Sequence, residues 1–102
     1  MEKIEFMKKK LDEYMEEHDI PEHMREGISN YVMYGIPAGG FLFSLLTNKL
    51  VETFLRADGI NKEKISDYVS FIYNCLPAGC WGNEEAYKEW IELKGFSRLN
   101  KA

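Results

Sequence analysis

Cysteine, proline and long apolar runs are scarce in this chain of 102 residues. Cys75 and Cys80 are its only cysteines, and His18 and His23 lie far from them in the sequence. A structural zinc site needs four ligands at recognisable spacing, so this pattern does not predict one. We expect two reduced thiols, partly buried beside aromatic residues, with a disulfide between them as the alternative.

Membrane-spanning segments and basic stripes are also missing. Even the most apolar stretch, 39–46, ends at Thr47, Asn48 and Lys49, which is too short to span a bilayer. The N-terminus lacks the uninterrupted apolar core of a secretion signal. With 13 basic and 17 acidic residues, the net charge is −4, whereas a general nucleic-acid binder carries a basic stripe. We expect a cytoplasmic protein that binds neither membranes nor polymeric nucleic acid.

Catalytic motifs are absent from the sequence as well. It contains no P-loop, dinucleotide-binding fingerprint or zinc-protease pattern. Neither His18 nor His23 lies near a serine or cysteine nucleophile in sequence. The acidic pairs at 16–17 and 84–85 diverge in direction on a helix, which favours a solvated face. We therefore expect no enzymatic activity, no cofactor and no metal.

Apolar residues recur every three to four positions through most of the chain, which predicts helices and no strand. The fold class is all-α, a compact bundle of about five helices in one domain, 1–102. Apolar residues cover most of the circumference of the helix that begins at the glycines, so it should be the most buried one. The helical core is 20–95, and an N-terminal amphipathic helix, 1–18, either packs on it or serves as an oligomerisation arm. The expected helices are 4–18, 20–34, 40–56, 61–76 and 84–95, with Asn61 as a candidate cap of the fourth.

One short string occurs twice, as IPAGGF at 36–41 and LPAGCW at 76–81. Each copy follows a helix that ends in aromatic or branched residues and precedes another helix. Proline ends a helix and glycine permits a sharp backbone turn. We therefore predict two similar helix-PAG-helix corners, with a chance likeness as the alternative, because the resemblance fades beyond each corner.

The first corner is the best candidate for a binding site. Gly39 and Gly40 open a helix, where free N–H groups and the positive end of the helix dipole suit a phosphate or carboxylate. Aromatic and amide side chains near the two corners suit the stacking and edge recognition of a base. The predicted ligand-binding residues are Tyr34, Pro37, Gly39, Gly40, Phe41, Asn48, Asn74 and Trp81.

Each of these residues also has a purely structural interpretation. The glycines serve close helix crossing, Trp81 packs the second corner, and Asn74 caps a carbonyl near a helix end. Asn48 stands among leucines, so it needs partners if it is buried and is merely solvated if it is exposed. The six tyrosines of the chain also suit an interface.

From the first corner onward, the chain resembles a widespread family of small, largely uncharacterised phage and prophage proteins. The match spans roughly residues 28–91, in a fixed order whose spacing is more specific than any single piece. Lys49 departs from the family pattern, in which an acidic residue often stands there. The residues that carry the resemblance are Pro37, Gly39, Phe41-Leu42, Asn48, Leu50, Ala57-Asp58, Asn61, Tyr73-Asn74, Pro77 and Trp81-Gly82.

The resemblance implies a phage origin and action in the bacterial host cytoplasm. The leading hypothesis is a counter-defence protein that binds and sequesters a nucleotide-derived immune signal without turning it over, as a homo-oligomer. The alternative is a protein-interaction module that inhibits a host defence protein and presents a flat or grooved apolar patch. A third interpretation is an accessory protein of virion assembly.

Overall fold

The computed structural model describes residues 3–99, with side chains through Ser97, so residues 1–2 and 100–102 of the predicted domain lie outside the described residues. Helices and their connections make up the described part of the chain, which contains no strand. This confirms the all-α class. The helices are α1 (Lys3–Glu17), α2 (Glu22–Tyr34), α3 (Gly40–Leu46), α4 (Leu50–Arg56), α5 (Gly59–Glu63), α6 (Ile65–Cys75), α7 (Glu84–Glu92) and α8 (Gly95–Leu99).

The described residues form eight helices rather than five, because the predicted helices 40–56 and 61–76 each correspond to two helices and α8 follows the predicted end of the fifth. The predicted helix 40–56 breaks at Thr47–Lys49, where Asn48 adopts a left-handed conformation with φ 64°. Asparagine tolerates this conformation better than most residues, because its short polar side chain makes local hydrogen bonds. Helix α7 ends before Lys94 and Gly95, which both have positive φ, and α8, which the sequence did not predict, follows.

The predicted cap of the fourth helix was also wrong. Asp58 caps α5, since its Oδ1 accepts a hydrogen bond from the backbone N–H of Asn61 at 2.7 Å. Asn61 is buried inside the turn, and its Oδ1 accepts from the Tyr68 hydroxyl at 2.6 Å. The short helix α5 therefore precedes α6 where the sequence predicted one helix.

Two predicted boundaries are confirmed: α2 ends at 34 and α7 begins at 84. Gly35 ends α2 in the left-handed conformation, as a C-terminal glycine does. The side chain of Asn83 accepts a hydrogen bond from the Ala86 N–H and caps α7. Both cysteines are free, with Cys80 buried and Cys75 partly buried.

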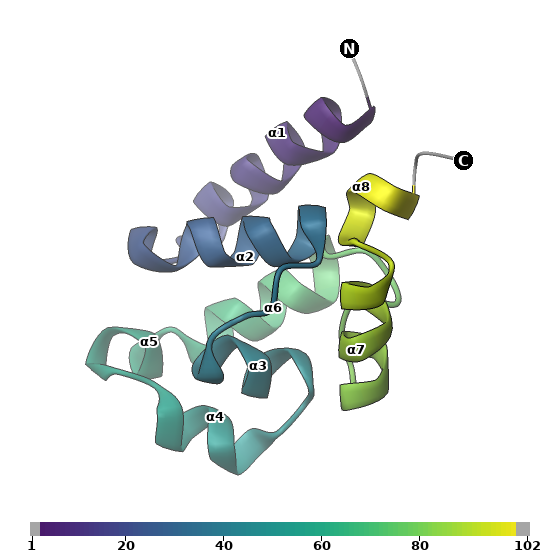
Figure 1. Ribbon diagram of the computed structural model, residues 1–102. Coiled ribbons are helices and arrows are strands. Elements are labelled where there is room, and N and C mark those ends of the chain that lie inside the picture. Colours follow the sequence, from purple (N-terminus) through teal and green to yellow (C-terminus); the bar gives the residue numbers. More distant parts are fainter. Residues whose placement is uncertain (1–2, 100–102) are drawn as a thin grey trace.

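Helix α2 crosses the middle of the fold, with α1 on one side and α3 and α4 on the other, while α6 lies behind α3 (Figure 1). Helix α1 packs on α2 and α6, and α8 packs on the end of α2. Leu11 and Met15 of α1 are fully buried in the core, so this helix packs on the domain. Whether it also joins two subunits stays a prediction. Among the residues described, no helix is long and apolar enough to cross a membrane.

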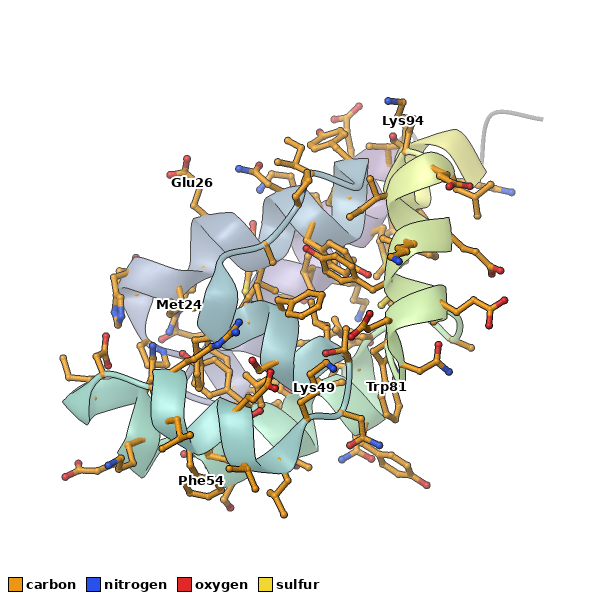
Figure 2. The ribbon with its side chains drawn as sticks, turned by 60° about the horizontal axis from the view of Figure 1, so that its bottom comes forward. Met24, Glu26, Lys49, Phe54, Trp81 and Lys94 are labelled. Atoms are coloured by element: carbon orange, nitrogen blue, oxygen red, sulfur yellow. The ribbon has the colours of Figure 1, made fainter. Side chains whose placement is uncertain are left out.

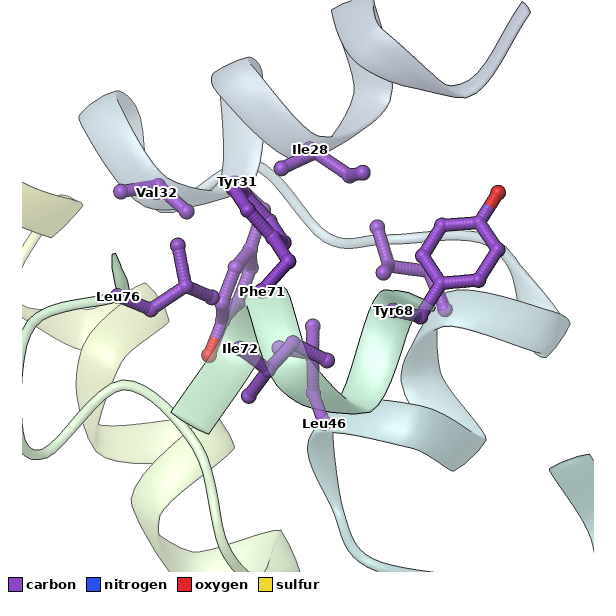
Figure 3. Close-up of a pocket in the computed structure, with 9 residues that line it drawn as sticks. Ile28, Tyr31, Val32, Leu46, Tyr68, Phe71, Ile72 and Leu76 are labelled. Atoms are coloured by element: carbon purple, nitrogen blue, oxygen red, sulfur yellow. The ribbon is translucent and has the colours of Figure 1, made fainter. Parts of the chain in front are cut away.

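The centre of the core lies between α2, α3 and α6. Side chains from these helices point toward one another there, with Ile28 and Tyr31 on α2, Leu46 on α3 and Phe71 on α6 (Figure 3). The space that they enclose does not hold a water molecule. It is packed core rather than a ligand cavity.

Candidate functional site: a groove and an apolar face

The first corner lies apart from Asn48. Gly39 and Gly40 are exposed at the start of α3, and the guanidinium of Arg56 lies 3.4 Å from the Gly40 carbonyl oxygen. Asn48 stands at the opposite end of α3, about 12 Å along the helix axis. With seven residues, α3 aligns few peptide dipoles. The corner and Asn48 therefore do not line one pocket.

Four more predicted residues, two of them within the first corner, have different surroundings. Tyr34 is exposed at the end of α2, and Pro37 is exposed in the connection to α3. Phe41 is buried, with its ring edge-on to Tyr68 at a centroid distance of 5.2 Å, so it belongs to the core. Asn74 lies on the exposed side of α6 and donates a hydrogen bond to the Ser70 carbonyl at 2.9 Å.

Asn48 and Trp81 do come together, in a groove along α6. The groove consists of two adjoining hollows of about 70 and 120 Å³, which share Leu45, Asn48 and Val69. The smaller one continues to Lys49, Leu50, Thr53 and Ile65, and the larger one to Ile72, Tyr73 and Trp81. The Tyr73 and Trp81 rings meet edge-on with centroids 6.1 Å apart. An exposed amide thus lies beside two aromatic rings, above an aliphatic floor.

A buried hydroxyl group holds the connection that carries Trp81. Tyr31 is fully buried, and its hydroxyl donates to the Cys80 carbonyl at 2.7 Å. The Gly82 N–H donates to the Leu46 carbonyl at 2.7 Å, which ties the same connection to α3. Burial raises the pKa of Tyr31 far above its ordinary value, so the hydroxyl stays a donor at every physiological pH.

Beside the groove, α4 presents an apolar surface to solvent. Leu50 is 72% exposed, Val51 69%, Phe54 44% and Leu55 78%. At 100° per residue, these four side chains span about 140° of the helix circumference. Thr53 is buried on the other side of α4. The sequence predicted that the helix 40–56 would be the most buried one, and for α4 this was wrong: one side of α4 carries large apolar side chains that remain exposed.

Val69 and Tyr73 continue this surface on α6, where they are also exposed. The groove links the two helices, because Leu50 and Val69 line one hollow and Val69 and Tyr73 the other. We call the surface formed by Leu50, Val51, Phe54, Leu55, Val69 and Tyr73 the α4–α6 face. In the view of Figure 2, Lys49 stands between Phe54 and Trp81.

The fold also pairs His18 with Cys75, which are far apart in the sequence. Cys75 Sγ lies 3.5 Å from His18 Nε2. Burial, and then the nearby charge of Glu17, raise the pKa of the Cys75 thiol above its ordinary value of 9.0. The thiolate is the nucleophilic form, so this arrangement disfavours rather than activates the sulfur. No group of three or more metal-ligating side chains occurs in the part of the chain that the structure describes.

Comparisons of this chain with protein-family models, with curated proteins and with solved structures found no match.

Proposed function

We propose that this protein acts by binding another protein through the α4–α6 face, without catalysing a reaction. The observation that carries the proposal is the exposure of four large apolar side chains on α4 beside an apolar groove. Leaving such a surface in water is unfavourable, and apolar patches of this kind mark interaction sites on soluble proteins.

The chemistry of the face favours a protein partner over a charged small molecule. Its rim carries Lys49, whose Nζ lies 2.7 Å from Glu84 Oε1, so this cation is already paired within the chain. The face itself contains no charged side chain, so it offers a phosphate little attraction. The resemblance to phage proteins points to a host defence protein as the partner, which the small protein would inhibit by occupying a surface.

Affinity capture from the bacterial host with matched variants tests this proposal. The wild type, Leu55→Glu and a control, Phe6→Ser, are each immobilised and exposed to host extract. Phe6 is half exposed on α1, away from the face. Phe6→Ser therefore removes a comparable apolar area from another part of the surface. A partner captured by the wild type and the control is then purified. Its affinity for Leu55→Glu should be at least tenfold weaker than for the wild type, because the glutamate would be desolvated in the contact.

A partner held equally by all three proteins would show that the contact lies elsewhere. Circular dichroism checks that each variant is folded, which we expect because both positions are exposed in the free protein.

A second proposal, sequestration of a nucleotide-derived signal, rests on one observation: Asn48 and Trp81 share a groove. The hollow they line, about 120 Å³, is below the roughly 300 Å³ of a small-molecule pocket. Native mass spectrometry tests it, on protein purified from cells with an active nucleotide-signalling defence. A defined small molecule released on denaturation would favour sequestration. An empty protein, with the signal shown to be present in the cells, would leave protein binding as the sole proposal.

A further inference from the structure

The α4–α6 face contains both a groove and an apolar helix that matches it. We infer that this face pairs two copies of the chain in the free protein, with α4 of each copy seated in the groove of the other. The inference rests on the proposed function, because both use the same surface. A host partner that binds the α4–α6 face must first displace the second copy.

The spacing of the side chains on α4 fits the spacing of the hollows. Val51 and Leu55 stand one helical turn apart, about 6 Å along α4. Along α6, Ile65 lines the smaller hollow and Tyr73 the larger, with Val69 shared between them, so the hollows are also offset by about one turn. Two apolar side chains at i and i+4 on a helix are the anchors that such a groove accepts.

The size of the face matches what a dimer contact requires. With about 150–200 Å² for each large side chain, the exposed parts of the six residues come to about 700 Å². A stable protein–protein contact buries about 800 Å² per partner, whereas the largest apolar patch on a monomer is usually about 300–600 Å².

The charges around the face are also compatible with a second copy. Two pairs within the chain flank α4: Lys49 with Glu84 and Arg56 with Glu52. Each pair is neutral, which gives a strongly charged partner no advantage there. A twofold contact places the same neutral pairs opposite themselves without net repulsion.

Sedimentation equilibrium on the full chain tests the inference. We expect the wild type to show twice its mass of 11.9 kDa at tens of micromolar, with no weakening in 0.5 M NaCl, because an apolar contact is not screened by salt. Val51→Glu should weaken the dimer at least tenfold, and so should Val69→Lys, since each buries a charge without a partner. The control Phe6→Ser should remain dimeric.

Mixing the two single variants tests the seating of α4. In a mixed pair, the glutamate at position 51 of one copy faces the lysine at position 69 of the other, while the second contact keeps both valines. Equimolar Val51→Glu and Val69→Lys should therefore form a dimer that neither forms alone. A wild type that is monomeric at 100 µM, a dimer lost in Phe6→Ser, or a mixture that stays monomeric would each overturn the inference.

These outcomes are separable from those of host-protein capture. A monomeric wild type that still loses a host partner on Leu55→Glu would leave the proposed function standing and remove the dimer. A dimer formed through the α4–α6 face, with no host partner sensitive to Leu55→Glu, would leave the dimer standing and remove the proposed function.

Discussion

Among single residues, Tyr31 has the clearest link between the core and the groove. Its ring stacks on Tyr87 at a centroid distance of 5.1 Å, and its hydroxyl satisfies the Cys80 carbonyl just before Trp81. Tyr31→Phe keeps the ring and leaves a buried carbonyl without a donor. We expect the free energy of unfolding to fall by about 1–3 kcal/mol, measured by urea denaturation.

The control for this substitution is Tyr34→Phe on the same helix. The Tyr34 side chain is exposed, so we expect a change below about 0.5 kcal/mol. Equal losses in the two variants would mean that the Tyr31 hydroxyl does not hold the connection 76–83 in place.

Residue-level signals in the sequence predicted several local features and missed others. The left-handed Gly35 and the Asn83 cap follow from residue type alone, because glycine and asparagine have strong preferences at these positions. Asn48 was interpreted as part of a continuous helix, since the segments on both sides of it, 41–46 and 50–55, are rich in apolar, helix-forming residues. Its break depends on how α4 packs after the turn, which local preference does not encode.

At the scale of elements, the end of α2 meets the start of α8 through two glycines. Gly35 has φ +67°, and a Cβ there would lie 2.8 Å from the Gly95 backbone nitrogen and 2.9 Å from the Trp90 carbonyl oxygen. Gly35→Ala would combine left-handed strain with a backbone clash. We expect it to lower the free energy of unfolding by at least about 2 kcal/mol in thermal or urea denaturation.

Gly27, in the middle of the same helix, provides the opposite case. A Cβ at this position meets nothing within 4 Å, and the backbone is already helical. Gly27→Ala should therefore raise the free energy of unfolding by about 0.5–1 kcal/mol, because alanine loses less backbone entropy on folding. If both substitutions destabilised to the same extent, the close approach of α2 and α8 would not be the cause.

Helices were predicted well where one face is apolar, and poorly at 40–56, where apolar residues cover most of the circumference. Helices α1, α2 and α6 have one buried side, and periodicity located all three within a few residues. Apolar residues over most of the circumference of 40–56 indicated burial, but periodicity cannot tell a covered side from an exposed one. The site had the same problem, since the spacing of Gly40, Asn48 and Asn74 along the chain did not fix their places around α3 and α6.

In the molecule as a whole, three exposed carboxylates join segments that are distant in sequence. Lys64 lowers the pKa of Asp19, and Lys49 lowers that of Glu84, in each case mainly by a hydrogen bond. The pKa of Asp58 is lowered mainly by the Asn61 N–H and further by His23. A carboxyl group whose pKa is lower in the folded protein stabilises the fold above its ordinary pKa and stops doing so as the pH falls through the folded value.

The free energy of unfolding should therefore fall as the solution becomes more acidic. The ordinary pKa values are 3.8 for the two aspartates and 4.5 for Glu84, so we expect a constant urea midpoint from pH 7 to about 5 and a progressive fall below about pH 4. Asp19→Asn isolates one contribution: it should be less stable than the wild type at pH 6, and the gap should be smaller at about pH 2.5, because protonation of Asp19 removes the charge that pairs with Lys64. The gap at pH 6 should be small and should shrink in salt, because Asp19 is exposed to solvent. A gap of the same size at both pH values would show that the asparagine acts through packing or backbone geometry near the left-handed residue 19, and not through the loss of the charge that pairs with Lys64.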